Sequence, residues 1–264
     1  MVASASDEKA GIGVVARAAA ILRVLGEEPT GMSLGQIAKK VGLARSTVQR
    51  IVSDLESEGL IMTGIGAGTI ALGPEFIRIA RQARPAIVDR MHPLMQQLSD
   101  ALEETVDLSM VQRRQIVFLD QVVGRQRLLA VSHVGDAFPL HCSSVGKAYL
   151  ATLSPEEIDG AIGSRYESRT PRTIRELSKL IKALAPIRAS GIGVDEEEHS
   201  EGICAVGIVF DDGMGGWYGL SVPMPVGRFH DKLKRAEQLL KRVRTDIPAV
   251  IAGTSPRVDL RAAS

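Results

Sequence analysis

Long apolar stretches are missing from this chain of 264 residues, and no run approaches the roughly 18 apolar residues that a membrane span needs. The first residues, MVASASDEKAGIG, also lack the basic flank and apolar block of a secretion signal. Cysteine is scarce, since Cys142 and Cys204 are too few for a disulfide framework. We therefore expect a cytoplasmic protein with no membrane partner.

An excess of charge of one sign is missing as well. The chain has 32 Lys and Arg against 31 Asp and Glu, which gives a formal net charge of +1. A nucleic-acid site must therefore come from local placement of charge and not from a basic field over the whole protein. Hydrophobic residues at 45% and charged residues at 24% are typical of globular proteins, and the length has room for about two domains.

Three short helices are predicted near the N-terminus, because apolar residues recur there at helical spacing. Their ranges are 14–25, 34–41 and 44–55. Ser33 and Gln36 have the spacing of a capping box at the start of the second helix. Gly42 and Gly59 follow the second and third helices, where left-handed caps are common. Two short helices joined by a tight glycine turn predict a helix-turn-helix.

A glycine-rich hairpin follows, with strand-like runs at 60–63 and 69–72 around the sequence GIGAG. It converts the unit into a winged helix-turn-helix domain over residues 13–73. Two helical stretches, separated by Pro85, then predict linker helices over residues 74–103.

Residues 104–250 are predicted to form an α+β domain with a mainly antiparallel sheet. Period-two or continuous apolar runs predict strands at 106–111, 115–123, 128–132, 203–210 and 217–222. Helical patterns occur at 144–153, 155–162, 173–189 and 229–245. Residues 1–12 and 251–264 are expected to be flexible tails.

The third helix offers hydrogen-bond donors on the side opposite its apolar stripe. Arg and Gln side chains suit the edges of guanine and adenine, and hydroxyl groups suit phosphates. The acidic residues Asp54, Glu56 and Glu58 come later, so the first half of the helix can enter a groove. The predicted DNA-binding residues are Ser33, Arg45, Ser46, Thr47, Gln49 and Arg50.

Other interpretations of this region stay open. A solvated polar face is typical of any surface helix, and small helical domains also bind proteins. The wing tip has no Lys or Arg, which predicts weak minor-groove contact. Arg78, Arg81 and Arg84 in the linker could touch phosphates, although an exposed helix face is the favoured explanation for them.

The second domain contains side chains that could support chemistry, so a metal-binding or enzymatic small-molecule sensor is the alternative function. His141 and Cys142 could pair as base and nucleophile, but adjacent residues rarely have the geometry, and no third group orients them. The side chains able to ligate a metal are His133, His141, Cys142, Asp195, Glu197 and His199. Their spacing matches no zinc motif, and we expect no cofactor and no catalytic residue.

Several blocks of sequence resemble the IclR family of bacterial transcriptional regulators. In the first domain they are ARAAAILRVL and LGQIAKKVGLARSTVQRIVSDLESEGLI. In the second they are PLHCSSVGKAYLA, IRASGIGVDEEEHSEGICAVGIVFDD and LSVPMPVGRF. The resemblance implies a winged helix, a linker helix and a GAF-like effector-binding domain. It also implies dimers, often paired into tetramers, that bind promoters of catabolic genes.

The resemblance further implies an effector pocket, formed in this sequence by Ser143, Ser144, Val145, Gly146, Asp195, Ala205 and Ser221. Backbone amides at the helix start after PLHC suit an anion, so a carboxylic acid is the expected effector. Relatives often carry a cysteine in the pocket, whereas here Ala205 takes that position and Cys204 is its neighbour. Neighbours on a strand face opposite sides, so Cys204 is expected to point away.

Together these observations predict a ligand-responsive regulator without enzymatic activity, more often a repressor than an activator. A homodimer, or a dimer of dimers, would bind an inverted-repeat operator on double-stranded DNA. Its two recognition helices would enter successive major grooves about 34 Å apart. A small organic or aromatic acid would change that binding.

Overall fold

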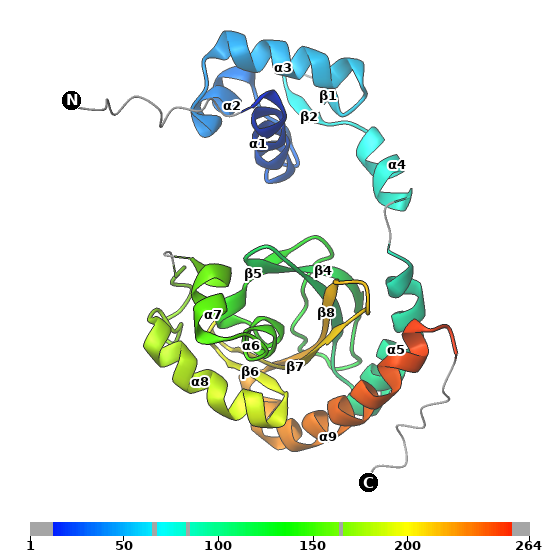
Figure 1. Ribbon diagram of the computed structural model, residues 1–264. Coiled ribbons are helices and arrows are strands. Elements are labelled where there is room, and N and C mark those ends of the chain that lie inside the picture. The colour runs from blue at the N-terminus through cyan, green and yellow to red at the C-terminus, as the bar shows by residue number, and fades with distance from the viewer. Residues whose placement is uncertain (1–12, 65–67, 83–84, 164–165, 255–264) are drawn as a thin grey trace, which may run out of the picture. The chain divides into compact units, whose positions relative to one another are not determined.

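A computed structural model describes residues 13–64, 68–82, 85–163 and 166–254 of the chain (Figure 1). The chain divides into two compact units, residues 1–84 and 85–264. The expected flexible tail at 1–12, most of the expected tail at 251–264 and the wing residues 65–67 lie outside the described residues. Each unit is described by itself below.

The first unit has helices at the predicted places and a two-stranded antiparallel hairpin. Its elements are α1 (Val14–Gly26), α2 (Leu34–Val41), α3 (Arg45–Ser57), β1 (Ile61–Thr63), β2 (Ile70–Leu72) and α4 (Glu75–Gln82). Met32 adds a single bridge to Ile70 beside the hairpin. The helix-turn-helix and the small sheet that follows it confirm the fold class predicted for this unit.

Caps fix the turn between α2 and α3. The Ser33 Oγ accepts the Gln36 backbone N–H at 3.3 Å, and the Gln36 Oε1 accepts the Ser33 N–H at 2.8 Å, which confirms the capping box. Gly42 has φ 67° and Gly59 has φ 70°, in the left-handed region that glycine occupies without strain. Both predicted glycine caps are thereby confirmed.

Only one side of α3 packs against the core of the first unit. Val48, Ile51 and Val52 are almost fully buried against Ile21 of α1 and Ile37 of α2. These α3 residues follow the helical repeat, so they form one stripe. The opposite side of α3 is left in solvent.

The second unit contains one six-stranded sheet and five α-helices among the described residues. Its strands are β3 (Val106–Gln112), β4 (Gln115–Val122), β5 (Ala137–Pro139), β6 (Gly193–Glu196), β7 (Ile203–Asp211) and β8 (Trp217–Pro225). Its helices are α5 (Ala86–Leu102), the 3-10 turn η1 (Leu140–Cys142), α6 (Ser144–Leu150), α7 (Pro155–Ile162), α8 (Leu177–Ser190) and α9 (Val226–Ile251).

Every pair of neighbouring strands in this sheet is antiparallel, in the order β5-β4-β3-β8-β7-β6. The sheet is curled, with α5 and α9 on its outer side and α6 on its inner side (Figure 1). One buried cluster joins α5, α9 and the outer face, and a second joins α6, α7 and α8 with β4. The predicted α+β class with an antiparallel sheet is therefore confirmed.

Side chains of β7 alternate between these two sides. Cys204, Val206 and Ile208 belong to the outer cluster beneath α5 and α9. Ala205 and Gly207, one residue away in each case, face the inner side where α6 lies. The inner face is thus free to carry polar residues without disturbing the outer core.

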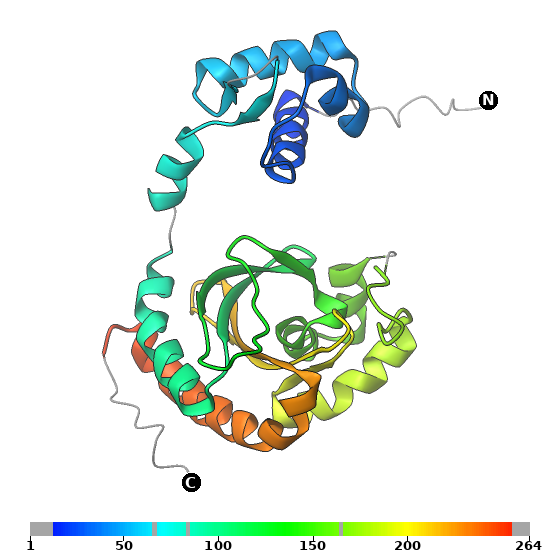
Figure 2. The ribbon, with the colours of Figure 1, turned by 180° about the vertical axis from the view of Figure 1, so that it is seen from behind.

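One predicted strand is wrong. Residues 128–132 form no strand in the structure but part of an irregular segment between β4 and β5, drawn in green without an arrow in Figure 2. Side chains hold this segment in place of strand pairing. The Leu128 carbonyl accepts a hydrogen bond from Arg228, and the Ser132 hydroxyl donates one to Asp107. The short strands β5 and β6 were not predicted.

Helix boundaries also differ from the predicted ones. The helix predicted at 173–189 begins at Leu177, because the Thr173 hydroxyl accepts the N–H groups of Arg169 and Thr170 in a loop. α9 runs to Ile251, six residues beyond the predicted end at 245. α5, predicted as part of a linker, packs against the sheet of the second unit through residues such as Leu98.

Candidate functional site

α3 presents a row of polar side chains to solvent. Arg45, Ser46, Gln49 and Arg50 are exposed, and Thr47 is half-buried. Residues 45 and 49, like 46 and 50, are one helical turn apart and therefore neighbours on the surface. The structure leaves Arg45, Ser46, Gln49 and Arg50 in solvent, whereas Thr47 borders the buried stripe, one helical turn before Ile51.

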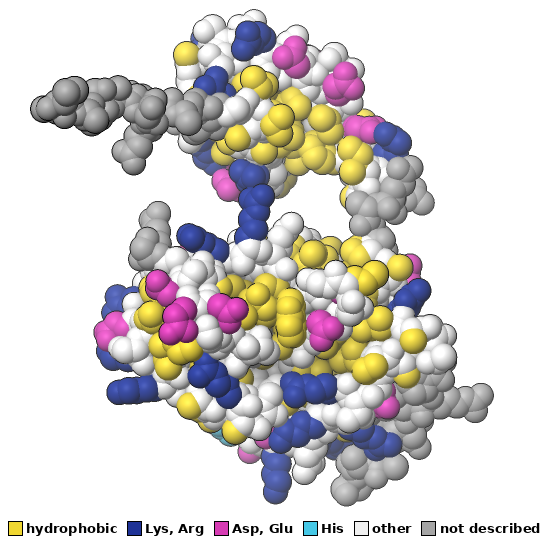
Figure 3. Space-filling view, in the orientation of Figure 1, with side chains coloured by type: hydrophobic (Ala, Val, Ile, Leu, Met, Phe, Trp, Pro, Cys, Tyr) yellow, Lys and Arg dark blue, Asp and Glu magenta, His cyan; other side chains and the backbone are white. Residues whose placement is uncertain are grey.

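Charge is divided along α3. Figure 3 shows Lys and Arg side chains toward the α2 end of the helix and Asp and Glu side chains toward the end that leads into β1. Among the described residues no ion pair engages Arg45 or Arg50, whereas Lys40 of α2 pairs with Glu28 at 3.1 Å. The guanidinium groups of α3 are therefore available to an external partner.

Ser33 and the linker arginines have other contacts. The Ser33 hydroxyl closes the capping box of α2, although the residue itself is exposed. Arg78 forms an ion pair with Glu75. The side chain of Arg81 and the whole of Arg84 lie outside the described residues.

A cavity of about 300 Å³ lies on the inner side of the sheet in the second unit. Its lining is mostly apolar, with serine hydroxyls, a histidine and two carboxyl groups. The lining residues are Asp107, Ile116, Phe118, Leu129, Ala130, Val131, Ser132, Phe138, Ser143, Ser144, Asp195, His199, Ser200, Ile203, Ala205, Ser221 and Pro223. The volume is at the lower end of the range for small-molecule sites.

Strand pairing places the polar groups of the cavity in two rows. Asp107 of β3 lies opposite Ser221 of β8. Asp195 of β6 lies opposite Ala205 of β7, which in turn faces Pro223 of β8. Three residues predicted for the pocket therefore come from three different strands, and the register brings them onto one face.

Glycines let α6 approach the sheet closely. A Cβ at Gly219 would lie 2.2 Å from a Val145 methyl, and one at Gly193 would lie 1.9 Å from the Ser144 carbonyl oxygen. This approach holds Ser143 and Ser144 at the edge of the cavity.

Two predicted pocket residues lie at this close approach. Val145 and Gly146 are not among the described residues that line the cavity. Val145 packs in the α6–α8 cluster, where its methyl groups fill the space above Gly219. Gly146 faces the backbone of Leu140, which leaves no room for a side chain.

Asp107 is a buried carboxyl that the sequence analysis missed. It is 1% exposed, and burial raises its pKa from 3.8 to about 6, although hydrogen bonds from Gln121 and Ser132 oppose the shift. The Gln121 amide donates to Oδ1 at 2.6 Å, and the Ser132 hydroxyl donates to Oδ2 at 3.1 Å. The sequence contains a signal for this inward-facing carboxyl, because polar residues alternate with Val106 and Leu108 along the predicted strand.

Asp195 is the second carboxyl of the cavity. Burial raises its pKa from 3.8 to about 7, against the lowering effects of the Glu198 backbone N–H, which Oδ1 accepts at 2.7 Å, and of Lys147. Lys147 itself forms a buried ion pair with Glu198. The positive charge nearest to Asp195 is thus already matched by another carboxylate.

His199 is neutral at physiological pH. Burial, followed by the charge of Arg169, lowers its pKa from 6.5 to about 4. The Arg169 guanidinium lies 3.0 Å from Nε2 and can only donate, so Nδ1 carries the proton and donates to the Ser200 hydroxyl at 2.8 Å. The ring stacks on Phe138 with centroids 3.6 Å apart and forms part of the cavity wall.

The two thiols are poorly suited to nucleophilic chemistry. Burial raises the pKa of Cys142 to about 12 and that of Cys204 to about 11, with nearby carboxylates adding to both shifts. The His141 Nε2 contacts the Glu167 carbonyl and not the neighbouring thiol. Within the described part of the chain, no three His, Cys, Asp or Glu side chains are arranged to hold a metal ion.

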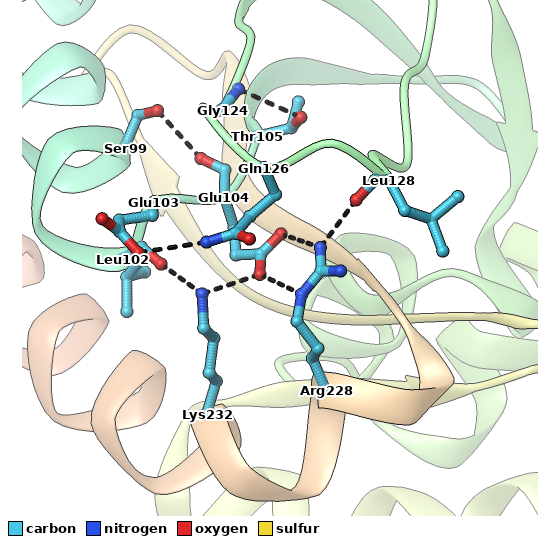
Figure 4. A network of polar contacts seen from close by, with 10 residues as sticks. All are labelled: Ser99, Leu102, Glu103, Glu104, Thr105, Gly124, Gln126, Leu128, Arg228 and Lys232. Carbon is cyan, nitrogen blue, oxygen red and sulfur yellow. Dashed lines mark hydrogen bonds and ion pairs between the residues drawn. The ribbon is translucent and has the colours of Figure 1, made fainter.

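A buried ion-pair network connects α5 with the irregular segment 123–136 between β4 and β5, called here the cavity loop. Glu104, which follows α5 directly, is fully buried and accepts from the Arg228 Nε and Nη2 at 2.8 and 2.9 Å and from the Lys232 Nζ at 2.8 Å (Figure 4). Burial alone would raise the pKa of Glu104, but the bonds from the two cations outweigh it and lower the pKa. Arg228 also donates to the Leu128 carbonyl at 2.8 Å, next to the cavity-lining Leu129.

Both units match known family models. The model for the C-terminal part of bacterial IclR transcriptional regulators matches residues 82–248, and the model for the IclR helix-turn-helix domain matches residues 14–63.

No helix among the described residues is both long and apolar enough to cross a membrane.

Several proteins are similar along nearly the whole chain. The transcriptional regulator Rv1719 of Mycobacterium tuberculosis is 43% identical over 94% of this chain and 95% of its own length. The regulator TtgV of Pseudomonas putida is 34% identical with the same coverage of both chains. The DNA-binding transcriptional repressor YiaJ of Escherichia coli is 29% identical over 94% of this chain and 90% of its own.

Solved structures share the fold. An IclR-type regulator from Silicibacter aligns with a TM-score of 0.79 at 23% identity, over 93% of this chain and 98% of that one. An IclR homologue from Microbacterium hydrocarbonoxydans, solved in complex with 4-hydroxybenzoate, aligns with a TM-score of 0.77 at 18% identity. That alignment covers 91% of this chain and 100% of the homologue.

Proposed function

This chain belongs to the IclR family of bacterial transcriptional regulators, and we propose that it is a ligand-responsive repressor without enzymatic activity. The observation that carries the proposal is the exposed polar row of α3, whose guanidinium groups have no ion-pair partner in the described part of the chain. A homodimer, or a dimer of dimers, places two such helices in successive major grooves of an inverted-repeat operator.

The DNA-binding part is tested by mobility shift with the protein's own upstream DNA. Arg45→Ala and Arg50→Ala each remove donors that suit guanine or phosphate, and each contact to a base is worth about 1–3 kcal/mol. The double variant is therefore expected to weaken binding by at least about 30-fold. Arg242→Ala, at an exposed position of α9 in the second unit, removes the same side chain and serves as the matched control.

Two outcomes would overturn this assignment. Unchanged DNA binding by the double variant would show that α3 does not read the operator in the proposed way. An equal loss in the Arg242→Ala control would show that overall charge, and not the α3 face, carries the binding. Circular dichroism on each variant separates both from unfolding.

The cavity in the second unit is the proposed effector site. Its enclosure by residues from all six strands of the sheet, by the irregular segment between β4 and β5 and by the start of α6 supports binding of a small organic molecule. The complex of the Microbacterium homologue with 4-hydroxybenzoate supports an aromatic ligand of that size. The sequence predicts a carboxylic acid, but the two carboxyl groups of the cavity oppose an anion, so the effector proposed here is only a small aromatic molecule. Ser144→Trp would fill the cavity and should abolish any ligand-induced rise in melting temperature.

The network around Glu104 is the proposed route from cavity to DNA. The cavity loop reaches Arg228 through the Leu128 carbonyl, and Arg228 holds Glu104 at the end of α5. α5 leads back along the sequence to α4 of the DNA-binding unit. A ligand that shifts the loop therefore changes how α5 is held. A coupling of about 1–3 kcal/mol would change operator affinity about 5- to 150-fold.

Repression of catabolic genes is the proposed outcome. The repressor YiaJ among the similar proteins supports repression, and the family resemblance supports a link between effector and catabolism. Comparing transcript levels with and without the gene, in the presence and absence of an effector found by thermal shift, tests the sign of control.

A further inference from the structure

The cavity contains two carboxyl groups, Asp107 and Asp195, and its described lining includes no lysine or arginine. We infer that the effector is a compact, mainly apolar molecule that carries a hydroxyl or amino group and no negative charge. The inference rests on the proposed function, because it names the chemical class of ligand for the same site.

The apolar part of the ligand follows from the walls. Ile116, Phe118 and Phe138 line one part of the cavity, and Ile203 and Pro223 line another. Phe118 and Phe138 meet edge to face with centroids 4.9 Å apart, so they offer a rigid aromatic surface. A cavity of about 300 Å³ with these walls has room for a molecule built around a single ring or a short branched chain.

The polar part follows from the acceptors. An ionised carboxylate only accepts hydrogen bonds, and its two oxygens offer about four positions. Asp107 accepts from Gln121 and Ser132, and Asp195 accepts from the backbone N–H groups of Glu198 and His199. Acceptor positions therefore remain on both groups, and a ligand O–H or N–H can use them.

An anionic ligand has no counter-charge in this site. Lys147 is paired with Glu198, and Arg169 is paired with Glu167 at 2.7 Å. His199 is neutral, because its Nε2 accepts from Arg169. At pH 8, above the raised pKa values of both Asp107 and Asp195, a ligand carboxylate would therefore face two like-charged groups inside a mostly apolar cavity, which is unfavourable.

The backbone amides before α6 give an anion little help. α6 has seven residues, and Val145 and Gly146 are not among the described residues that line the cavity. The Ser143 hydroxyl already donates to the Pro139 carbonyl at 2.9 Å, so toward a ligand it can only accept. The start of α6 thus adds to the preference for a donor.

Three single-ring probes of similar size test the inference: benzylamine, benzyl alcohol and benzoate, each at millimolar concentration and pH 8. We expect both donors to raise the melting temperature of the full-length protein and benzoate to leave it unchanged. By calorimetry, benzylamine should bind at least about tenfold more tightly than benzoate, because the carboxylates attract the ammonium group and repel the carboxylate of benzoate.

Variants assign the preference to the two carboxyl groups. Asp107→Asn together with Asp195→Asn should remove the advantage of benzylamine over benzoate, and each single variant should reduce it. The single variants keep the test informative if the double variant does not fold. Asp159→Asn, at an exposed position of α7 outside the cavity, should behave like the wild type.

The inference is overturned if benzoate stabilises the wild type as well as the donors do, or if neither donor stabilises it. It is also overturned if the Asn variants keep the wild-type order of affinities. The mobility shift with upstream DNA is read separately. Loss of that shift in the wild type would contradict the proposed regulator, whereas a normal shift with a preference for benzoate would contradict only the ligand class.

Discussion

At the scale of single residues, Asp195 makes stability depend on pH in a direction opposite to most carboxyl groups. Folding raises its pKa from 3.8 to about 7, so the folded chain holds this proton more tightly than the unfolded chain does. Between about pH 4 and pH 7 the unfolded state loses the proton first, and the contribution of Asp195 to stability falls as pH rises.

Asp195→Asn should remove this penalty. Relative to the variant, the wild type is expected to lose roughly 2–3 kcal/mol of unfolding free energy between pH 5 and pH 8. Urea unfolding at several pH values measures the difference, with the exposed Asp54→Asn as control. Parallel curves for wild type and Asp195→Asn would show that the group is not desolvated as described.

The two thiols give a second residue-scale prediction. Cys142 and Cys204 are 0% and 1% exposed, and the pKa of each is raised well above 8.5. Only the thiolate is nucleophilic, so iodoacetamide should label neither thiol in the folded protein at pH 8 and both in urea. Rapid labelling of the folded protein, read by mass spectrometry, would contradict this and reopen thiol chemistry.

At the scale of elements, the contact of α6 with the sheet depends on missing side chains. Gly219→Ala would place a Cβ 2.2 Å from Val145, so we expect a loss of about 1–3 kcal/mol by thermal or urea unfolding. Gly160→Ala is the matched control, because nothing lies within 4 Å of its Cβ position in α7. That change should be neutral or stabilise by about 0.5–1 kcal/mol. Adding Val145→Ala to Gly219→Ala should restore part of the loss; without such rescue, the clash is not the cause.

The network joining α5 to α9 gives a prediction of its own. Glu104→Gln removes the charge that Arg228 and Lys232 share at a fully buried position (Figure 4). Breaking such a group typically costs about 3–5 kcal/mol. The exposed pair of Lys179 and Glu176 on α8 is the control, and Glu176→Gln should cost less than about 1 kcal/mol. Similar small losses in both variants would show that the network contributes little.

Elements with strong local signals were predictable from the sequence. The capping box at Ser33 and the glycine caps mark α2 and α3, because these signals act within a few residues. The strand predicted at 128–132 failed because its partners are side chains distant in sequence, such as Arg228. The four residues of β6 are too few to show a period.

The candidate site was predictable only in part for the same reason. Ser143, Ser144, Asp195, Ala205 and Ser221 were named from the family resemblance, and the structure places all five around the cavity. The aromatic wall and His199 come from segments that only the sheet register brings together. Nothing local in the sequence states which strands are neighbours.

At the scale of the whole molecule, the cavity and its supporting cores belong entirely to the second unit. All lining residues, and both clusters that flank the sheet, lie between residues 85 and 264. We expect a fragment of residues 85–264 to fold cooperatively, with a single thermal transition and a near-ultraviolet dichroism spectrum. The fragment should not shift upstream DNA. A fragment without a cooperative transition would show that the second unit needs the first to fold.

On β3 the Asp107 side chain faces the cavity, whereas Val106 and Leu108 pack on the side of α5. Ligand contact and core packing therefore depend on alternate residues of one strand. Natural selection can therefore exchange the ligand-facing positions while every helix-facing position stays untouched. A combinatorial library limited to the alternate inward positions of β3, β7 and β8 should for that reason contain a high proportion of folded clones. Some of these clones should respond to different inducers. The same diversity placed on the outward positions should yield mostly unfolded protein.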